Sequence, residues 1–169
     1  HGDHQGLNLT TAVRDGIVGH TGAHIPVTLE GQIIRIVDRI AYLCHDFDDA
    51  QRAGMLTAEE LPFEVREHFG MTPSSMITAM VEDMVRESLD KPVISMSTDI
   101  EMTMNLFRQF MFKNVYLAPA LIPDRNKASH VVKNLFTHFM EHPDDMEGCE
   151  STREFYSTRD VVDYGAGLT

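Results

Sequence analysis

Apolar side chains recur along the chain at helical spacing, and no segment shows the strict alternation of a half-buried strand. A first short helix is predicted from about Thr11 to His20. It is followed by a loop from Thr21 to Pro26, in which Gly22 and Pro26 break the helical periodicity. Thr28 is a residue type that caps helix N-termini, so the next helix is predicted from about Leu29 to Ala53. It stops at Gly54, because glycine readily adopts the left-handed conformation beyond a helix end.

Three further helices are predicted downstream. Thr72 and Pro73 form a cap and first turn, and apolar residues then recur at helical spacing to Leu89. A helix from Ser97 or Thr98 to about Ala118 has apolar residues around its whole axis, so it is predicted to be buried on all sides. The last helix covers about Ala128 to Glu141, and the polar stretch beyond it is predicted to be loop. The chain is therefore expected to be all-α, with residues 1–169 forming a single helical unit.

The helix from Leu29 to Ala53 is the most informative element. On a helical wheel at roughly 100° per residue, one side is apolar and is predicted to face the core. That side holds Ile33, Ile36, Val37, Ile40, Leu43, Cys44 and Phe47. The opposite side carries three carboxylates, an imidazole and a phenol, with two arginines on its flank: Asp38, Tyr42, His45, Asp46 and Asp49, flanked by Arg35 and Arg39.

Two interpretations of this polar face are open. Charged residues opposite an apolar stripe usually form a solvated surface. However, aspartate, histidine and tyrosine form helices less readily than the glutamate, lysine and glutamine that commonly fill exposed positions. Carboxylates and imidazole bind divalent metals, and a tyrosine nearby can contact a substrate. His45 lies two turns from Asp38, too far along the axis for one ion to reach both easily.

Arg108 is unusual because it interrupts the apolar helix that ends near Ala118. A guanidinium stays charged when it is buried, so a buried Arg108 needs an anionic or carbonyl partner. A structural ion pair and a bound phosphate both satisfy that need. Tyr116 follows two turns later on an adjacent face, so the two side chains are expected to line one pocket.

Composition limits the class of protein. The 169 residues have a net charge of -12 and a pI near 5.0, which argues against a general nucleic-acid-binding surface. The two cysteines are Cys44 and Cys149, and no signal peptide or long apolar run is visible. We therefore expect a cytoplasmic protein without disulfides and without membrane insertion.

Five ordered segments and the C-terminal tail resemble one known family. They are Gly6-Leu-Asn-Leu-Thr10, Thr28-Leu-Glu-Gly-Gln32, Asp38-Arg-Ile-Ala-Tyr42, His45-Asp-Phe-Asp-Asp-Ala50, Phe112-Lys-Asn-Val-Tyr116 and Arg159-Asp-Val-Val-Asp-Tyr-Gly-Ala-Gly-Leu-Thr169. Together they are similar to bacterial deoxyguanosinetriphosphate triphosphohydrolase-like proteins of the HD superfamily. The chain thus resembles a helical HD-domain fragment.

The resemblance implies a function and a set of site residues. In that family a divalent metal is held by a histidine, a His-Asp pair and a later aspartate, which Asp38 matches. Deoxynucleoside triphosphates are cut to deoxynucleoside and tripolyphosphate by water that attacks the α-phosphorus, and the enzymes commonly form oligomers. The remaining matches would contact the substrate: Tyr42 and Asp46 the deoxyribose, Arg39 and Arg108 the phosphates, and Tyr116 the sugar edge where a 2′-hydroxyl would crowd.

One departure from the family is plain. Its upstream metal ligands, and the residues thought to assist water attack, precede the Gly6-Leu-Asn-Leu segment, and here only His1 to Gln5 do so. A catalytic metal usually needs three protein ligands, so this segment alone is expected to bind it weakly and hydrolyse little. We assign no catalytic residue. The alternatives are an inactive helical module that binds nucleotide or protein, or an HD phosphohydrolase that acts on another phosphate ester.

Overall fold

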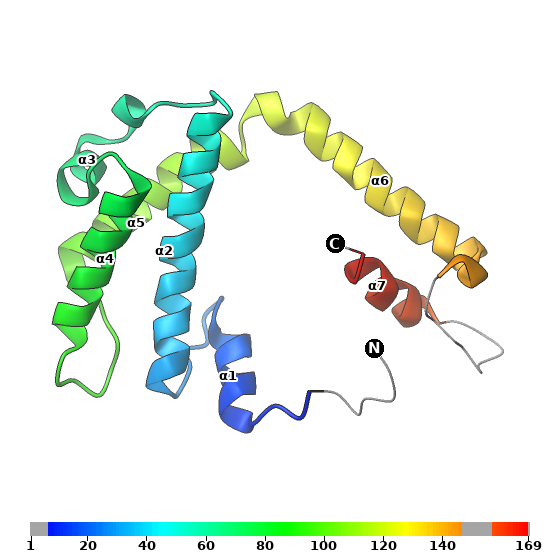
Figure 1. Cartoon of the computed structure of the whole chain (residues 1–169), viewed down its shortest axis with the longest axis horizontal. Helices are drawn as coiled ribbons and strands as arrows, with labels where there is room; N and C mark the ends of the chain where they lie inside the picture. Colours follow the sequence, from blue (N-terminus) through cyan, green and yellow to red (C-terminus); the bar gives the residue numbers. More distant parts are fainter. Residues whose placement is uncertain (1–6, 147–156, 169) are drawn as a thin grey trace. The chain divides into compact units, whose positions relative to one another are not determined.

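The computed structural model describes residues 7–146 and 157–168, and within these ranges every regular element is helical (Figure 1). The α-helices are α1 (Thr11–Gly19), α2 (Leu29–Arg52), α3 (Phe63–Phe69), α4 (Pro73–Ser88), α5 (Thr98–Met111), α6 (Ile122–Glu141) and α7 (Thr158–Ala166). The all-α prediction is confirmed.

The chain folds as two compact units, His1–Leu117 and Ala118–Thr169. Every candidate site residue lies in the first unit, and each unit is described by itself. The expectation that residues 1–169 act as one helical unit stays a prediction. No helix within the described ranges combines the length and apolar character that a membrane span requires.

Helix α2 is the central element of the first unit. Thr28 caps it as predicted, since its hydroxyl accepts a hydrogen bond of 3.2 Å from the Gly31 amide. Gly54 follows the helix with a φ of 67°, in the left-handed region that glycine tolerates. The apolar side packs against α4 and α5, and its buried residues are Ile36, Ile40, Leu43, Cys44 and Phe47. The predicted orientation of α2 is thus confirmed for these residues, whereas Ile33 is 37% exposed.

The start of α2 is fixed to α1 by Arg35. Its guanidinium donates hydrogen bonds to the carbonyl oxygens of Gly19 at 2.7 Å, Gly22 at 2.6 Å and His24 at 3.1 Å. These contacts satisfy carbonyl groups at the end of α1 and in the loop that follows. Arg35 on the flank of α2 is therefore a structural residue.

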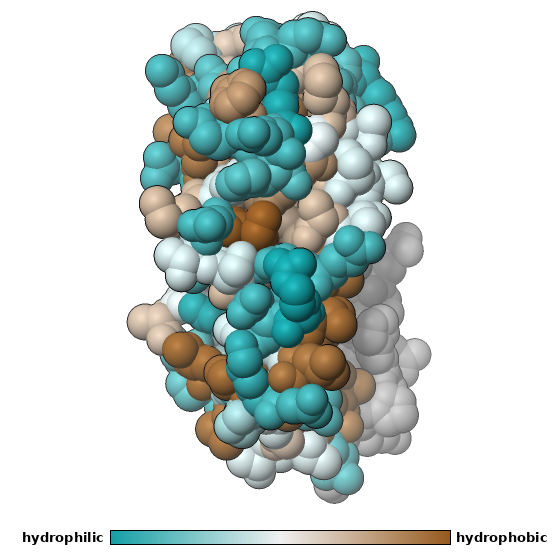
Figure 2. All heavy atoms as spheres, turned by 90° about the vertical axis from the view of Figure 1, so that its left-hand side faces the viewer, coloured by the Kyte–Doolittle hydropathy of each residue, from teal (hydrophilic) through white to brown (hydrophobic). Residues whose placement is uncertain are grey.

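A buried carboxylate links α4 to α5. Asp83 is only 2% exposed and forms an ion pair with Arg86. Its second oxygen accepts a hydrogen bond of 2.8 Å from the amide of Ser97, the residue that precedes α5. The face in Figure 2, on the side of α3 and α4 in Figure 1, mixes polar with apolar side chains.

The prediction that the helix after Ser97 is buried all round is wrong. Helix α5 packs one face on α2 and α3, so Met104, Phe107 and Met111 are buried, whereas Met102 is 65% exposed. Periodicity records where apolar side chains lie but not whether another element covers them. Within the described ranges, nothing covers the outer face of α5 enough to bury it.

The predicted loop beyond Glu141 is also partly wrong, because α7 lies within it. Ser157 caps α7, and Val161 is buried against Phe139 and Met146 in the core of the second unit. The helix is only 9 residues long. The apolar repeat that would indicate this helix in the sequence is correspondingly short. Cys149 lies outside the described residues.

Candidate functional site

The polar side of α2 holds three candidate residues that differ in burial. Asp38 is exposed, whereas Tyr42 and Asp46 are half-buried. They follow each other at intervals of four residues, so they lie on one face, one turn apart. The same face also carries His45 and Asp49, which are exposed.

Tyr116 joins this face from a distant part of the chain. Its hydroxyl donates a hydrogen bond of 2.6 Å to Oδ2 of Asp46, across a separation of 70 residues. Burial raises the pKa of Tyr116 well above its ordinary value, and Asp46 and Tyr42 raise it further. Tyr116 is therefore a protonated hydrogen-bond donor at neutral pH.

A π-helical turn, Phe112–Tyr116, presents Tyr116 to α2. The amide of Leu117 donates to the carbonyl of Phe112 at 2.9 Å, which closes the wider turn. Turns of this kind are rare and frequently occur at functional sites. They change the direction of the side chains that follow, so an ordinary extension of α5 would aim Tyr116 elsewhere.

Phe112 connects Tyr116 to Arg108. The rings of Phe112 and Tyr116 meet edge to face, with centroids 5.0 Å apart at 77°. Cζ of Arg108 lies over the same Phe112 ring, 5.0 Å from its centroid. We call Asp46, Arg108, Phe112 and Tyr116 the Tyr116 cluster. Helical periodicity assigned no site role to Phe112, although its spacing of four residues from both Arg108 and Tyr116 is visible in the sequence.

The premise that Arg108 is a buried charge is wrong. Its side chain is exposed on the outer face of α5. Among the described residues, its guanidinium forms neither an ion pair nor a hydrogen bond with a carboxylate. The structural ion pair is therefore not formed in this part of the protein, and the phosphate role stays a prediction.

Arg39 faces a different cavity on the flank of α2. This cavity of about 330 Å³ has mixed polar and apolar walls, and they include Gln32, Arg35, Arg39, Ser95, Glu101 and Met104. Within the described ranges, neither Asp38 nor Arg39 forms a side-chain hydrogen bond or ion pair. The structure thus pairs Asp46 with Tyr116 and links Arg108 to Tyr116 through the ring of Phe112, but it shows no contact of Asp38 or Arg39 with them.

The described residues do not form a complete metal site. No group of three or more His, Cys, Asp or Glu side chains in these ranges lies close enough to hold an ion. Asp38 has an exposed carboxylate without a partner there, so it is free to act as one ligand. A metal would need further ligands from other residues.

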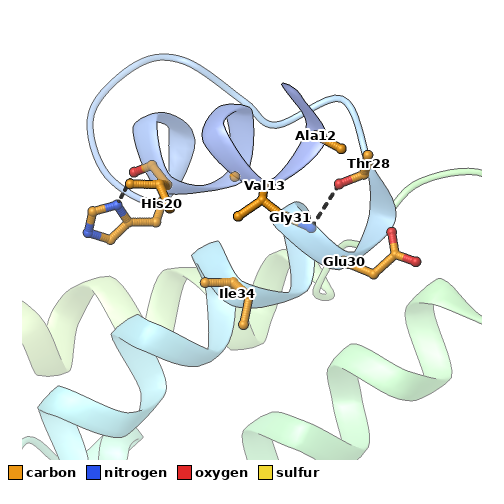
Figure 3. Close-up of a pocket in the computed structure, with 9 residues that line it drawn as sticks. Ala12, Val13, His20, Thr28, Glu30, Gly31 and Ile34 are labelled. Atoms are coloured by element: carbon orange, nitrogen blue, oxygen red, sulfur yellow. Dashed lines mark hydrogen bonds between the residues drawn. The ribbon is translucent and has the colours of Figure 1, made fainter. Parts of the chain in front are cut away.

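A groove of about 730 Å³ between α1 and the start of α2 holds none of the candidate residues. Figure 3 shows its walls, which include Val13 of α1 and Ile34 of α2. His20 and Glu30 are its ionisable residues, and the His20 ring lies 2.6 Å from the carbonyl of Ile17. The groove is an apolar surface without a cluster of chemical groups, so the Tyr116 cluster is the better candidate site.

Comparison with known proteins relates the chain to phosphohydrolases. Residues 94–169, which include Arg108 and the π-helical turn, match the phosphohydrolase-associated domain. The chain is also 40% identical over 169 residues to a deoxyguanosinetriphosphate triphosphohydrolase-like protein from Caldanaerobacter subterraneus subsp. tengcongensis. That match covers 99% of the chain and 50% of the relative. Over nearly its whole length, this chain is similar to deoxyguanosinetriphosphate triphosphohydrolase-like proteins.

Two other proteins with the same description extend the relationship. The one from Clostridium perfringens is 36% identical over 178 residues, covering 97% of this chain and 51% of the relative. The one from Brucella suis is 28% identical over 237 residues, covering the whole chain and 59% of the relative. The chain spans about half the length of the curated relatives it matches.

Proposed function

We propose that residues 1–169 form part of the nucleotide site of a metal-dependent deoxynucleoside triphosphate triphosphohydrolase. The reaction would convert a deoxynucleoside triphosphate to a deoxynucleoside and tripolyphosphate. The hydrogen bond between Tyr116 and Asp46 carries the proposal, because it joins two predicted sugar-contacting residues from distant parts of the chain. The descriptions of the relatives support the reaction type.

The sugar end of the substrate would lie against Tyr42, Asp46 and Tyr116. Asp46 uses Oδ2 to accept from Tyr116, and its other oxygen can accept a sugar hydroxyl. The ring of Tyr116 packs against the ring of Phe112 in an edge-to-face arrangement. A side chain held by two contacts cannot easily move aside. It would therefore clash with the extra 2′-hydroxyl of a ribonucleotide and disfavour its binding.

The phosphate end would be bound by Arg39 and Arg108. Both guanidinium groups have no carboxylate partner among the described residues, so binding a phosphate breaks no ion pair there. Their planar arrays of donors match phosphate oxygens. In a chain with a net charge of -12, cations are needed at the phosphate end to hold a triphosphate.

Asp38 would provide one ligand to a divalent metal ion. When bound, such an ion polarises a phosphate and generates hydroxide from water. Further ligands would have to come from residues outside the ranges 7–146 and 157–168, because one carboxylate cannot hold a catalytic ion by itself.

The test of Asp38 uses the full-length protein and a matched carboxylate. Asp38→Ala should abolish metal-dependent release of tripolyphosphate from deoxyguanosine triphosphate and leave the circular dichroism spectrum unchanged, because the side chain is exposed. Asp49→Ala, which removes another exposed carboxylate of α2, should retain activity. Equal turnover of wild type and Asp38→Ala at saturating metal would refute the ligand role.

A second function has one observation in its favour. Because the described residues hold no group of three metal ligands, a helical module that binds nucleotide without cutting it also fits. Full-length protein that binds deoxyguanosine triphosphate but releases no tripolyphosphate with Mg²⁺ or Mn²⁺ would favour this function.

A further inference from the structure

Phe112 contacts two residues of the proposed nucleotide site, Arg108 and Tyr116, and the proposed function gives it no separate role. One face of its ring meets the guanidinium of Arg108 at 5.0 Å. The Tyr116 ring contacts it edge to face at 5.0 Å. Phe112 is 40% exposed, so its side chain is not simply a core residue. Its position in the π-helical turn fixes both contacts at once.

The contact with Arg108 affects how a phosphate would be bound. Arg108 is exposed, and a free arginine side chain samples many rotamers that it loses when it binds a ligand. A guanidinium held over an aromatic face has already lost part of that freedom. Less entropy is then lost on binding, so the ligand binds more tightly.

The contact with Tyr116 acts at the sugar end. Asp46 fixes the hydroxyl of Tyr116, but one hydrogen bond does not fix the plane of the ring. The edge-to-face contact at 77° does so, in a geometry that aromatic pairs favour. Phe112 and Asp46 therefore hold Tyr116 at two ends.

We propose that Phe112 is a positioning residue that orients Arg108 toward phosphate and Tyr116 toward sugar within one nucleotide site. This inference rests on the proposed function. It adds that the two ends of the site are mechanically linked through one aromatic ring, which touches the binding residues and need not touch the substrate.

The test compares deoxyguanosine triphosphate with deoxyguanosine. Dissociation constants of both are measured by calorimetry on full-length protein in EDTA, where metal-dependent hydrolysis is stopped. Phe112→Leu removes the aromatic ring and should weaken triphosphate binding about two- to fivefold more than deoxynucleoside binding. Phe112→Tyr retains the ring and should retain the wild-type ratio of the dissociation constants for deoxyguanosine triphosphate and deoxyguanosine. Phe63→Leu, the same change at a phenylalanine that is 64% exposed, should also leave the ratio unchanged.

A second set of variants asks whether Phe112 acts through Arg108. In an Arg108→Ala background, Phe112→Leu should no longer change the ratio of the two dissociation constants. An equal loss in both backgrounds would overturn the positioning role. If the leucine variant does not fold, Phe112→Met provides a flexible side chain of similar size without a ring.

The positioning role of Phe112 and the proposed function would be contradicted by different results. If Arg108→Ala weakens triphosphate binding but Phe112→Leu does not, the positioning role is wrong and the proposed function stands. If Arg108→Ala leaves the ratio unchanged, the phosphate end of the proposed function is wrong, and the positioning role falls with it.

Discussion

Tyr116 and Asp46 form the contact on which the site depends. The neutral hydroxyl of Tyr116 donates a hydrogen bond to the carboxylate of Asp46. Both side chains are half-buried, so the bond is partly protected from water. Helical periodicity identified Asp46 as part of a polar face. It could not pair Asp46 with Tyr116, because contacts between residues far apart in the chain depend on the tertiary fold.

This hydrogen bond should be measurable as a coupling energy. We expect Asp46→Ala and Tyr116→Phe to be non-additive by about 1 kcal/mol, the usual net value of one intramolecular hydrogen bond. Urea unfolding followed by circular dichroism of the two single variants and the double variant provides the coupling. Additive losses would mean that the bond contributes nothing to the folded state.

The raised pKa of Tyr116 sets the pH range of its contribution. Because the folded pKa exceeds the unfolded value of about 10, the contribution is fully present below pH 10 and is lost as the pH rises through the folded pKa. The stability difference between wild type and Tyr116→Phe should thus stay constant up to about pH 10 and shrink above it. A difference that already shrinks between pH 8 and 9 would contradict the raised pKa.

Cys44 should be chemically silent in the folded protein. It is fully buried in the core, and burial raises its pKa to about 12, so little of the reactive thiolate exists near neutral pH. Iodoacetamide at pH 8 should therefore label the peptide that contains Cys44 in urea but not in native buffer, as read by mass spectrometry. Equal labelling in both conditions would show that the core around α2 is open.

At the scale of elements, the start of α2 depends on close packing around Pro26. A β-carbon added at Gly31 would lie 2.5 Å from Cβ of Pro26 and 3.2 Å from the capping hydroxyl of Thr28. A β-carbon at Gly16 in α1 would meet its nearest neighbour at 3.7 Å, an ordinary contact. The two glycines therefore differ in space, although both are helical.

Alanine substitutions at these positions should have opposite effects. Gly16→Ala should raise the free energy of unfolding by up to about 1 kcal/mol, because alanine has a higher helix propensity than glycine. Gly31→Ala should destabilise by about 1–3 kcal/mol, because overpacking outweighs that gain. Thermal unfolding provides both values. A higher melting temperature for both variants would show that the contact of Gly31 with Pro26 does not restrict the helix start.

Helices with clear capping or terminating residues at their ends were predicted from the sequence. Thr28, Gly54 and Thr72 marked helix ends within about a residue, because capping is a short-range effect that the sequence displays directly. The burial of α5 was predicted wrongly, since an apolar surface is buried only where another element covers it. The π-helical turn was not predicted, because it depends on hydrogen bonds that side-chain periodicity does not report.

At the scale of the whole molecule, we propose that the chain provides part of a site rather than all of one. It has the hydrogen-bonded pair Tyr116 and Asp46, two arginines without carboxylate partners among the described residues, and the exposed carboxylate of Asp38. Relatives are about twice as long as the matched region. In our proposal these residues would bind and orient the nucleotide, and this role can be tested separately from hydrolysis.

Binding of deoxyguanosine triphosphate to full-length Arg108→Ala is the most direct test of that nucleotide site. Because Arg108 is exposed, the empty variant should unfold within a few degrees of wild type. Loss of a charge-assisted phosphate contact of about 1.5–3 kcal/mol should weaken triphosphate binding roughly 10- to 150-fold, with little change for deoxyguanosine. Calorimetry in EDTA with both ligands measures this. Unchanged triphosphate affinity, or an equal loss for deoxyguanosine, would show that the Tyr116 cluster does not bind the phosphate end of a nucleotide.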